Sequence, residues 1–265
     1  MTFKIIYTNG DSFAAGDELA YAQFYPDFSQ LFRQNETLPD KKKLVKKWGE
    51  AMAKDWDKYR KFEETCREMS YTAKLGNLLN LPWMNMAKGG RSNQEMIGLT
   101  IEYLERRLLR IYKPEEILVV LGITNFERFM IPSEQSITGT ASLIVGYPAQ
   151  DSANVYNYYL SNFNENYAMI DNVVSFLGGL QYLTSKGISF LLVDNLMYSR
   201  SKVIYINKLN NPMIHLLPKE DLIMGEYVSR TEPETHICGH FAEPVHERVA
   251  NELAKIAKER FADKF

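Results

Sequence analysis

The stretch Thr8-Asn9-Gly10-Asp11-Ser12-Phe13-Ala14 decides which fold is expected for this chain. It follows the apolar and β-branched run from Phe3 to Tyr7, which predicts a buried strand near the start of the sequence. The asparagine, glycine and aspartate of the stretch favour a turn, and Ser12 favours the start of a helix. The pattern therefore predicts a strand that leads through a tight turn into a helix, with a serine at the junction.

Two similar units follow along the chain. The run 81–86 predicts a short strand, followed by the glycine-rich turn 87–93 and a long amphipathic helix that continues to about Tyr112. The run 115–121 is the clearest buried strand, and Asn125 stands in the turn after it. Because the carboxyl ends of parallel strands meet at one edge of a sheet, we expect the three turns to lie close together.

Strand and helix patterns alternate along the rest of the chain. Helices are expected at about 70–80, 167–185 and 244–261, and a further strand at 188–193. No stretch repeats at a fixed period. This alternation is typical of a parallel sheet with helices on both faces. We therefore expect an α/β fold with three layers, α/β/α, and a flavodoxin-like parallel sheet that carries helical and loop insertions.

The length and composition favour one large domain. The chain has 265 residues, 45% of them hydrophobic, which is enough for a substantial core. We expect a single domain over residues 1–265, with insertions at about 20–70 and 131–165. The first insertion combines amphipathic helices with an aromatic-rich segment that we expect to be core (Tyr21, Phe24, Tyr25, Phe28 and Phe32). The second is rich in Ser, Thr, Asn, Tyr and Gly and is expected near the mouth of the site.

Charge and cysteine content argue against several classes of protein. The formal net charge is −2, which gives no overall attraction to nucleic acid or to a membrane, and neither is expected as a partner. The lysine-rich stretch 41–47 is best explained as a solvated helix face. The two cysteines, Cys66 and Cys238, do not suggest a disulfide framework. No signal peptide or transmembrane pattern is found, so we expect synthesis in the cytoplasm. The oligomeric state is not predicted.

Four short patterns, in this order, resemble the SGNH (GDSL-like) hydrolase superfamily. They are Gly10-Asp11-Ser12, a glycine in the second turn, Gly122-x-x-Asn125 in the third, and a histidine just before the last helix. The opening Gly-Asp-Ser-Phe-x-x-Gly-Asp-Glu-Leu and the turn Ala-x-x-Gly-x-Ser-Asn resemble a branch often found in bacteriophage genomes. That likeness would place the protein in the host cytoplasm or in a virion.

The resemblance implies a serine ester hydrolase that acts through an acyl-serine intermediate. Ser12 would be the nucleophile, and the Ser12 N–H, the Gly90 N–H and the Asn125 amide would form the oxyanion hole. Gly89 takes the place of Gly90 if the turn is offset by one residue. No metal or organic cofactor is implied. The polar and aromatic insertions favour a small-molecule or carbohydrate ester, and we expect an esterase or deacetylase acting on an O-acetylated carbohydrate.

The general base departs from the family pattern. The family uses a histidine in an Asp-x-x-His arrangement, and His240 has the matching place, but Ile237 stands where the aspartate is expected. One explanation is a dyad of Ser12 and His240, in which a backbone carbonyl or a distant acid such as Asp194 holds the imidazole.

Two more explanations of this departure stay open. Glu243-Pro244-Val245-His246 could supply a Glu-x-x-His version of the motif, so Glu243, His246 and also Asp11 are possible supporting residues. Alternatively, the chain is a non-catalytic binding or virion-associated structural module that retains the fold. The group His236, Cys238, His240 and His246 lacks zinc-finger spacing and a second cysteine pair, so no metal site is predicted.

Overall fold

The computed structural model describes residues 2–17, 19–25, 50, 54–124, 128–132, 140–144, 165–194 and 243–265. The strands are β1 (Ile5–Gly10), β2 (Trp83–Asn85), β3 (Ile117–Ile123), β4 (Arg128–Pro132), β5 (Thr140–Ile144) and β6 (Ser189–Asp194). The α-helices are α1 (Ser12–Ala15), α2 (Tyr21–Phe24), α5 (Trp56–Met69), α6 (Tyr71–Leu79), α7 (Asn93–Arg106), α9 (Glu165–Ser185) and α12 (Glu243–Arg260). Three short 3₁₀ turns are η1 (Leu108–Arg110), η2 (Pro114–Glu116) and η3 (Ala262–Lys264).

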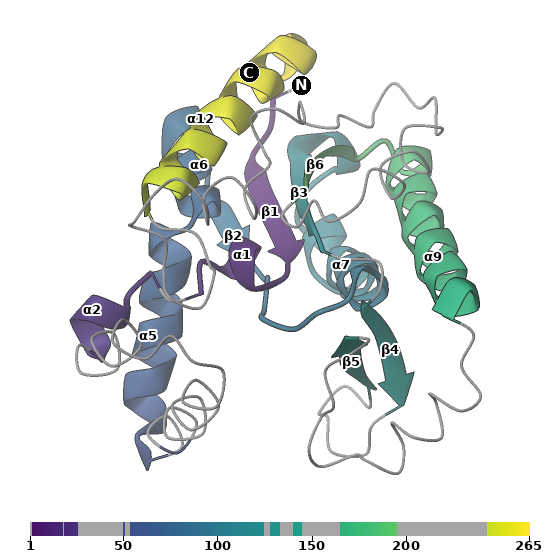
Figure 1. Cartoon of the computed structure of the whole chain (residues 1–265). Coiled ribbons are helices and arrows are strands. Elements are labelled where there is room, and N and C mark those ends of the chain that lie inside the picture. The colour runs from purple at the N-terminus through teal and green to yellow at the C-terminus, as the bar shows by residue number, and fades with distance from the viewer. Residues whose placement is uncertain are drawn as a thin grey trace.

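In the described part of the chain, four strands form a central parallel sheet in the order β2-β1-β3-β6 (Figure 1). This is the order of the first four strands of a flavodoxin-like sheet, so the expected sheet is confirmed. In the register, Gly10 lies opposite Gly122, and Gly122 lies opposite Val193. The carboxyl ends of β1, β3 and β6 therefore lie at one edge of the sheet.

Helices cover both faces of this sheet (Figure 1). Side chains alternate between the faces along each strand. Ile6 and Leu118 belong to the core under α6 and α12, whereas Tyr7 and Val119 belong to the core under α7 and α9. The predicted three-layer α/β/α arrangement is confirmed.

The two insertions are described only in part. β4 and β5 pair antiparallel in a separate two-stranded sheet, with Phe129 opposite Leu143. Part of this hairpin lies in the region 131–165, whose polar composition carries no strand signal. The division into a single domain with two insertions stays a prediction.

The first strand is longer than the sequence indicates. Asn9 and Gly10 were expected in a turn, but they continue β1 and pair with Leu121 and Gly122 of β3. Pairing with a neighbouring strand overrides the local turn preference of these residues. The turn is correspondingly compressed, and only Asp11 separates β1 from α1.

The helix after the second turn is shorter than the sequence indicates. It was expected to reach about Tyr112, but α7 ends at Arg106. Arg107 leaves the helical conformation, with φ −128° and ψ −68°. The chain then continues as η1, in which Leu108 still packs into the core on the α7 and α9 face.

Part of the aromatic-rich segment forms a small core of its own. Tyr21 and Tyr25 are buried against Phe62 of α5, with ring centroids 5.4 and 5.5 Å apart respectively. The expectation of core is confirmed for these two tyrosines. Phe28 and Phe32 lie outside the described residues.

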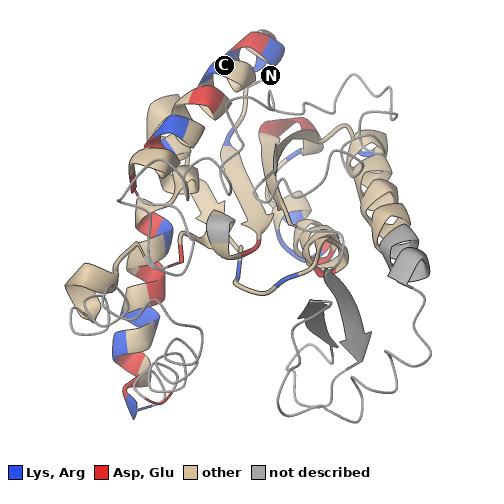
Figure 2. Cartoon of the chain, viewed as in Figure 1, with Lys and Arg blue, Asp and Glu red and all other residues tan. Residues whose placement is uncertain are grey.

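Charges of both signs alternate along the outer surface of α5 and α12 (Figure 2). The lysine-rich stretch 41–47 lies outside the described residues. Within the described part of the chain, none of the helices combines the length and the apolar character needed to span a bilayer.

Candidate active site

Ser12 is the first residue of α1, directly beyond the carboxyl end of β1. The Ala15 N–H donates to the Asp11 carbonyl at 3.0 Å, and the Asp17 N–H donates to the Ser12 carbonyl at 3.0 Å. These bonds fix the backbone on both sides of the serine. Ser12 is 7% exposed and Asp11 is fully buried. The predicted strand, turn and helix start are therefore present, and they hold the serine rigidly at the sheet edge.

A glycine at position 10 is required by close packing. A Cβ built there would lie 2.6 Å from the Ala14 Cβ and 3.0 Å from the Gly122 carbonyl oxygen. The Ala14 side chain and the Gly122 backbone together leave no room for a side chain at position 10. As a result, α1 can fold back closely against the end of β1.

The second turn lies beside the first. The Met86 N–H donates to the Thr8 carbonyl at 2.8 Å, and the Lys88 N–H donates to the Gly10 carbonyl at 3.2 Å. The parallel ladder between β1 and β2 thus continues past the end of β2. It carries the following residues, Gly89 and Gly90, to the end of β1.

Gly89 contacts the serine turn directly. A Cβ built at Gly89 would lie 3.6 Å from the Ser12 Cβ and 2.7 Å from the Asp17 Oδ2. Gly90 has φ +83°, a conformation that glycine adopts at little cost. Gly89 therefore lies beside Ser12, whereas a Cβ built at Gly90 would meet nothing within 4 Å.

The third turn is held by a pair of hydrogen bonds from α7. The Asn93 Nδ2 donates to the Thr124 carbonyl at 2.8 Å, and the Thr124 N–H donates to the Asn93 Oδ1 at 2.9 Å. Asn125, the predicted amide donor, follows Thr124 in sequence and lies outside the described residues. Asp194, the distant acid considered for the base, ends β6, with its Cα opposite Ile123.

His240, His236 and Cys238 also lie outside the described residues, whereas His246 does not. His246 is buried between α12 and α6, and its Nδ1 accepts the Tyr71 N–H at 3.0 Å. Its ring stacks on Tyr71 with centroids 5.7 Å apart. Because Nδ1 is an acceptor, a neutral His246 carries its proton on Nε2. A serine base needs the opposite arrangement, with Nε2 free to accept a proton.

Glu243 points to a different partner. Its carboxylate forms an ion pair with Lys74 Nζ at 2.8 Å. In a triad the carboxylate would accept a hydrogen bond from the Nδ1–H of His246, but here Nδ1 accepts a hydrogen bond from the Tyr71 N–H. This geometry does not favour the Glu-x-x-His motif as the source of the base.

Buried amides around the turns are not predicted by the sequence patterns. Asn85 is 6% exposed; its Nδ2 donates to the Ala14 carbonyl at 2.8 Å, and its Oδ1 accepts the Ala87 N–H at 3.0 Å. It therefore joins the end of α1 to the start of the second turn. The signal that the sequence does carry is an amide at the end of an otherwise apolar strand, a pattern that Asn9 shares.

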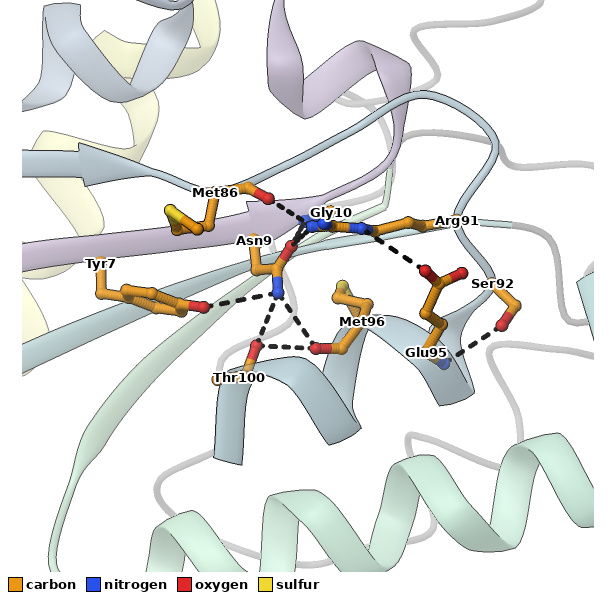
Figure 3. Close-up of polar contacts among 9 residues, drawn as sticks. All are labelled: Tyr7, Asn9, Gly10, Met86, Arg91, Ser92, Glu95, Met96 and Thr100. Carbon is orange, nitrogen blue, oxygen red and sulfur yellow. Dashed lines mark hydrogen bonds and ion pairs between the residues drawn. The ribbon is translucent and has the colours of Figure 1, made fainter. Parts of the chain in front are cut away.

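Asn9 and Arg91 form a second connection between the turns (Figure 3). Asn9 is fully buried, and its Oδ1 accepts from Arg91 Nη1 at 2.7 Å. Arg91 Nη1 also donates to the Met86 carbonyl, and Arg91 Nε lies 3.9 Å from Glu95 Oε1. Burial lowers the pKa of Arg91, and the charge of Glu95 opposes that shift. Burial also raises the pKa of Tyr7, below Asn9, to about 12.

A pocket of about 310 Å³ opens beside this connection. It lies on the α7 side of the sheet. Its lining residues are Tyr7, Asn9, Met86, Arg91, Leu99, Glu102, Tyr103, Arg106 and Arg107.

No model of a known protein family matches the sequence, and a search of curated proteins gives no significant match. Solved structures do match the fold. One is TesA, with a TM-score of 0.47 at 12% identity, over 97% of this chain and 100% of that one. Another is a carbohydrate esterase family 2 enzyme with a carbohydrate binding domain from Corynascus thermopiles (Myceliophthora fergusii). It has a TM-score of 0.51 at 13% identity, over 98% of this chain and 67% of that one. The second likeness shows that this chain shares the fold of that enzyme.

Proposed function

We propose that this chain is a serine ester hydrolase of the SGNH superfamily. The observation that carries the proposal is the contact between the first two turns. Ser12 stands at the end of β1, and Gly89 lies beside it, since a Cβ built at Gly89 would be 3.6 Å from the Ser12 Cβ. A nucleophile beside a glycine turn is the arrangement that an acyl-transfer site requires, because backbone N–H groups can then reach the oxyanion.

The proposed reaction runs through an acyl-enzyme. Ser12 Oγ attacks the ester carbonyl carbon while His240 takes the hydroxyl proton. The Ser12 and Gly90 N–H groups and the Asn125 amide hold the oxyanion. His240 then gives the proton to the leaving alcohol. Water attacks the acyl-serine next, and a carboxylic acid and the free serine are released.

We assign the base to His240 rather than to His246. The assignment is supported by the bond from the Tyr71 N–H to His246 Nδ1, which leaves the wrong nitrogen protonated for a base. His246 is instead a structural residue between α12 and α6.

The substrate class that we favour is an acetyl ester of a carbohydrate. It is supported by the polar and aromatic residues of the insertions and by the likeness to a carbohydrate esterase family 2 fold. The bacteriophage origin, the cytoplasmic or virion location and the absence of nucleic-acid and membrane partners stay predictions.

The test is labelling with a fluorophosphonate probe, together with hydrolysis of 4-nitrophenyl acetate. We expect both in the wild type and neither in Ser12→Ala or His240→Ala. Ser185→Ala replaces an exposed serine at the end of α9 and should behave as the wild type. His246→Gln should keep the label.

Circular dichroism of each variant shows whether it folds. A folded wild type that takes no label and hydrolyses no ester contradicts the proposal and favours a binding module. Loss of label in a folded His246→Gln moves the base to His246.

A further inference from the structure

We infer that Arg91 is a positioning residue that sets the distance between the serine turn and the glycine turn, an inference that rests on the proposed function. Arg91 follows Gly90 directly, so its backbone is continuous with a proposed oxyanion donor. Its side chain turns back across the end of β1 (Figure 3). It is 15% exposed, which is low for an arginine.

The guanidinium closes the second turn on itself. Met86 stands where the chain enters the turn, and Arg91 stands where it leaves. Arg91 Nη1 donates to the Met86 carbonyl, so the entry and the exit are held together by one charged donor. A hydrogen bond from a charged donor is stronger than one between neutral groups.

The same nitrogen also joins the second turn to the first. It donates at 2.7 Å to the Oδ1 of Asn9, and that oxygen accepts the Gly10 N–H at 2.9 Å. Gly10 is separated from Ser12 by Asp11 alone. Arg91 is therefore linked through Asn9 to the backbone that presents the nucleophile.

Asn9 is itself held on its other side by α7. Its Nδ2 donates to the Met96 carbonyl and to the Thr100 Oγ1, each at 3.1 Å. A fully buried amide is costly unless its polar atoms are bonded, and here both the Oδ1 and the Nδ2 have partners. Asn9 thus gives Arg91 a fixed anchor rather than a mobile one.

This arrangement predicts an effect on the chemical step rather than on substrate binding. If the hydrogen bonds from Arg91 to Met86 and Asn9 are lost, we expect the Gly90 N–H to shift relative to Ser12. A small misplacement of this donor weakens oxyanion stabilisation strongly. Arg91 has no role in taking or giving a proton. Its removal should therefore lower kcat and leave KM nearly unchanged.

The chain offers a matched control for this test. Arg106 lines the same pocket, but it pairs at 2.9 Å with Glu102 one turn earlier on α7, and its side chain is 73% exposed. Its ion-pair partner thus lies on its own helix rather than in either turn. Arg106→Ala removes the same chemical group from the same pocket and leaves the hydrogen bonds of Arg91 to Met86 and Asn9 in place.

The experiment measures kcat and KM for 4-nitrophenyl acetate in Arg91→Ala and Arg106→Ala, with and without millimolar guanidinium. We expect Arg91→Ala to lose about 10- to 100-fold in kcat, with KM within about threefold of the wild type. Added guanidinium should restore much of that loss, because the pocket of about 310 Å³ leads to the vacated place. Arg106→Ala should keep the wild-type kcat and not respond to guanidinium.

Arg91→Lys covers the case in which Arg91→Ala does not fold. Its single ammonium keeps the charge but not the planar fork, so an intermediate kcat is expected, against an unchanged kcat in Arg106→Lys. Circular dichroism measures the folded fraction of every variant.

Three results would overturn the inference: an unchanged kcat in a folded Arg91 variant, a kcat loss explained by the unfolded fraction, or a loss in Arg91→Ala that guanidinium leaves untouched. In each of them the wild type stays active, so the ester-hydrolase proposal survives. A wild type with no activity overturns both.

Discussion

At the scale of single residues, buried amides take the place of apolar side chains where the strands end. Asn9 and Asn85 each lie in a strand of the parallel sheet. Asn85 bonds the backbone of the second turn, and Asn9 bonds the Arg91 side chain that follows that turn. An apolar residue would fill the same space but would form no hydrogen bond that positions the neighbouring loop. The amides therefore add specificity of loop position at the cost of burying polar groups.

Tyr7 gives a prediction about alkaline stability. It is 1% exposed, and burial raises its pKa to about 12 from 10.0. The unfolded chain therefore releases this proton first as the pH rises. The contribution of Tyr7 to stability is complete below pH 10 and is lost between about pH 10 and 12.

The check is the free energy of unfolding of the wild type and of Tyr7→Phe, measured by urea titration from pH 9 upward. Phenylalanine cannot ionise, so the stability of the wild type relative to the variant should fall by roughly 3 kcal/mol over this window. Parallel curves for the two proteins would show that the Tyr7 phenol is not shielded in the folded state.

At the scale of elements, one glycine sets how closely α7 and α9 approach. A Cβ built at Gly179 of α9 would lie 1.9 Å from the Cγ1 of Ile97 on α7. The neighbouring Gly178 has open space around its Cβ position. The two helices, which cover one face of the sheet, therefore meet at Gly179 (Figure 1).

This contact predicts opposite effects for two adjacent substitutions. Gly179→Ala should lower the free energy of unfolding by about 1–3 kcal/mol, because the added methyl forces α7 and α9 apart. Gly178→Ala should raise it by up to about 1 kcal/mol, because alanine favours a helix. Thermal unfolding of both variants checks this. A stabilised Gly179→Ala would mean that the helices are not in close contact there.

The elements also mark what the sequence could predict. Pattern alone identified the run 115–121 as a buried strand, and the observed strand, β3, begins and ends two residues later, at Ile117 and Ile123. The continuation of β1 through Asn9 could not be predicted, because it depends on pairing with β3. The bond between Asn9 and Arg91 joins residues 82 apart, and no local pattern encodes it.

The same distinction holds for the candidate site. Ser12 and the glycine turn were predicted from their order along the chain, since parallel strands bring their carboxyl ends together. The role of His246 was not predictable. Its spacing from Glu243 suits a triad, but its environment depends on how α12 packs against α6, and there it bonds Tyr71.

At the scale of the whole molecule, the two ends of the described chain meet (Figure 1). The Phe3 N–H donates to the Lys264 carbonyl at 2.9 Å. The Phe3 ring packs against Phe261 and Phe265, with centroids 5.6 and 5.4 Å apart. The entry to β1 is thus closed by the residues that follow α12.

This closure predicts that Phe261 matters for global stability. It is 7% exposed, so Phe261→Ala should lower the free energy of unfolding by about 3–5 kcal/mol through lost burial and a cavity. Phe265 is 42% exposed, and Phe265→Ala should cost about 1 kcal/mol. Urea unfolding checks both, with equal m-values expected. Equal losses in the two variants would contradict a closure centred on Phe261.

The position of α12 also has a consequence for synthesis on the ribosome. β1 emerges well before α12, yet one face of it packs against Val249 and Leu253 of that helix. Until α12 emerges, α6 covers the apolar side chains on that face only in part. Nascent chains therefore pass through a stage in which the sheet can form but one of its faces is incompletely covered, and chaperone binding is expected there.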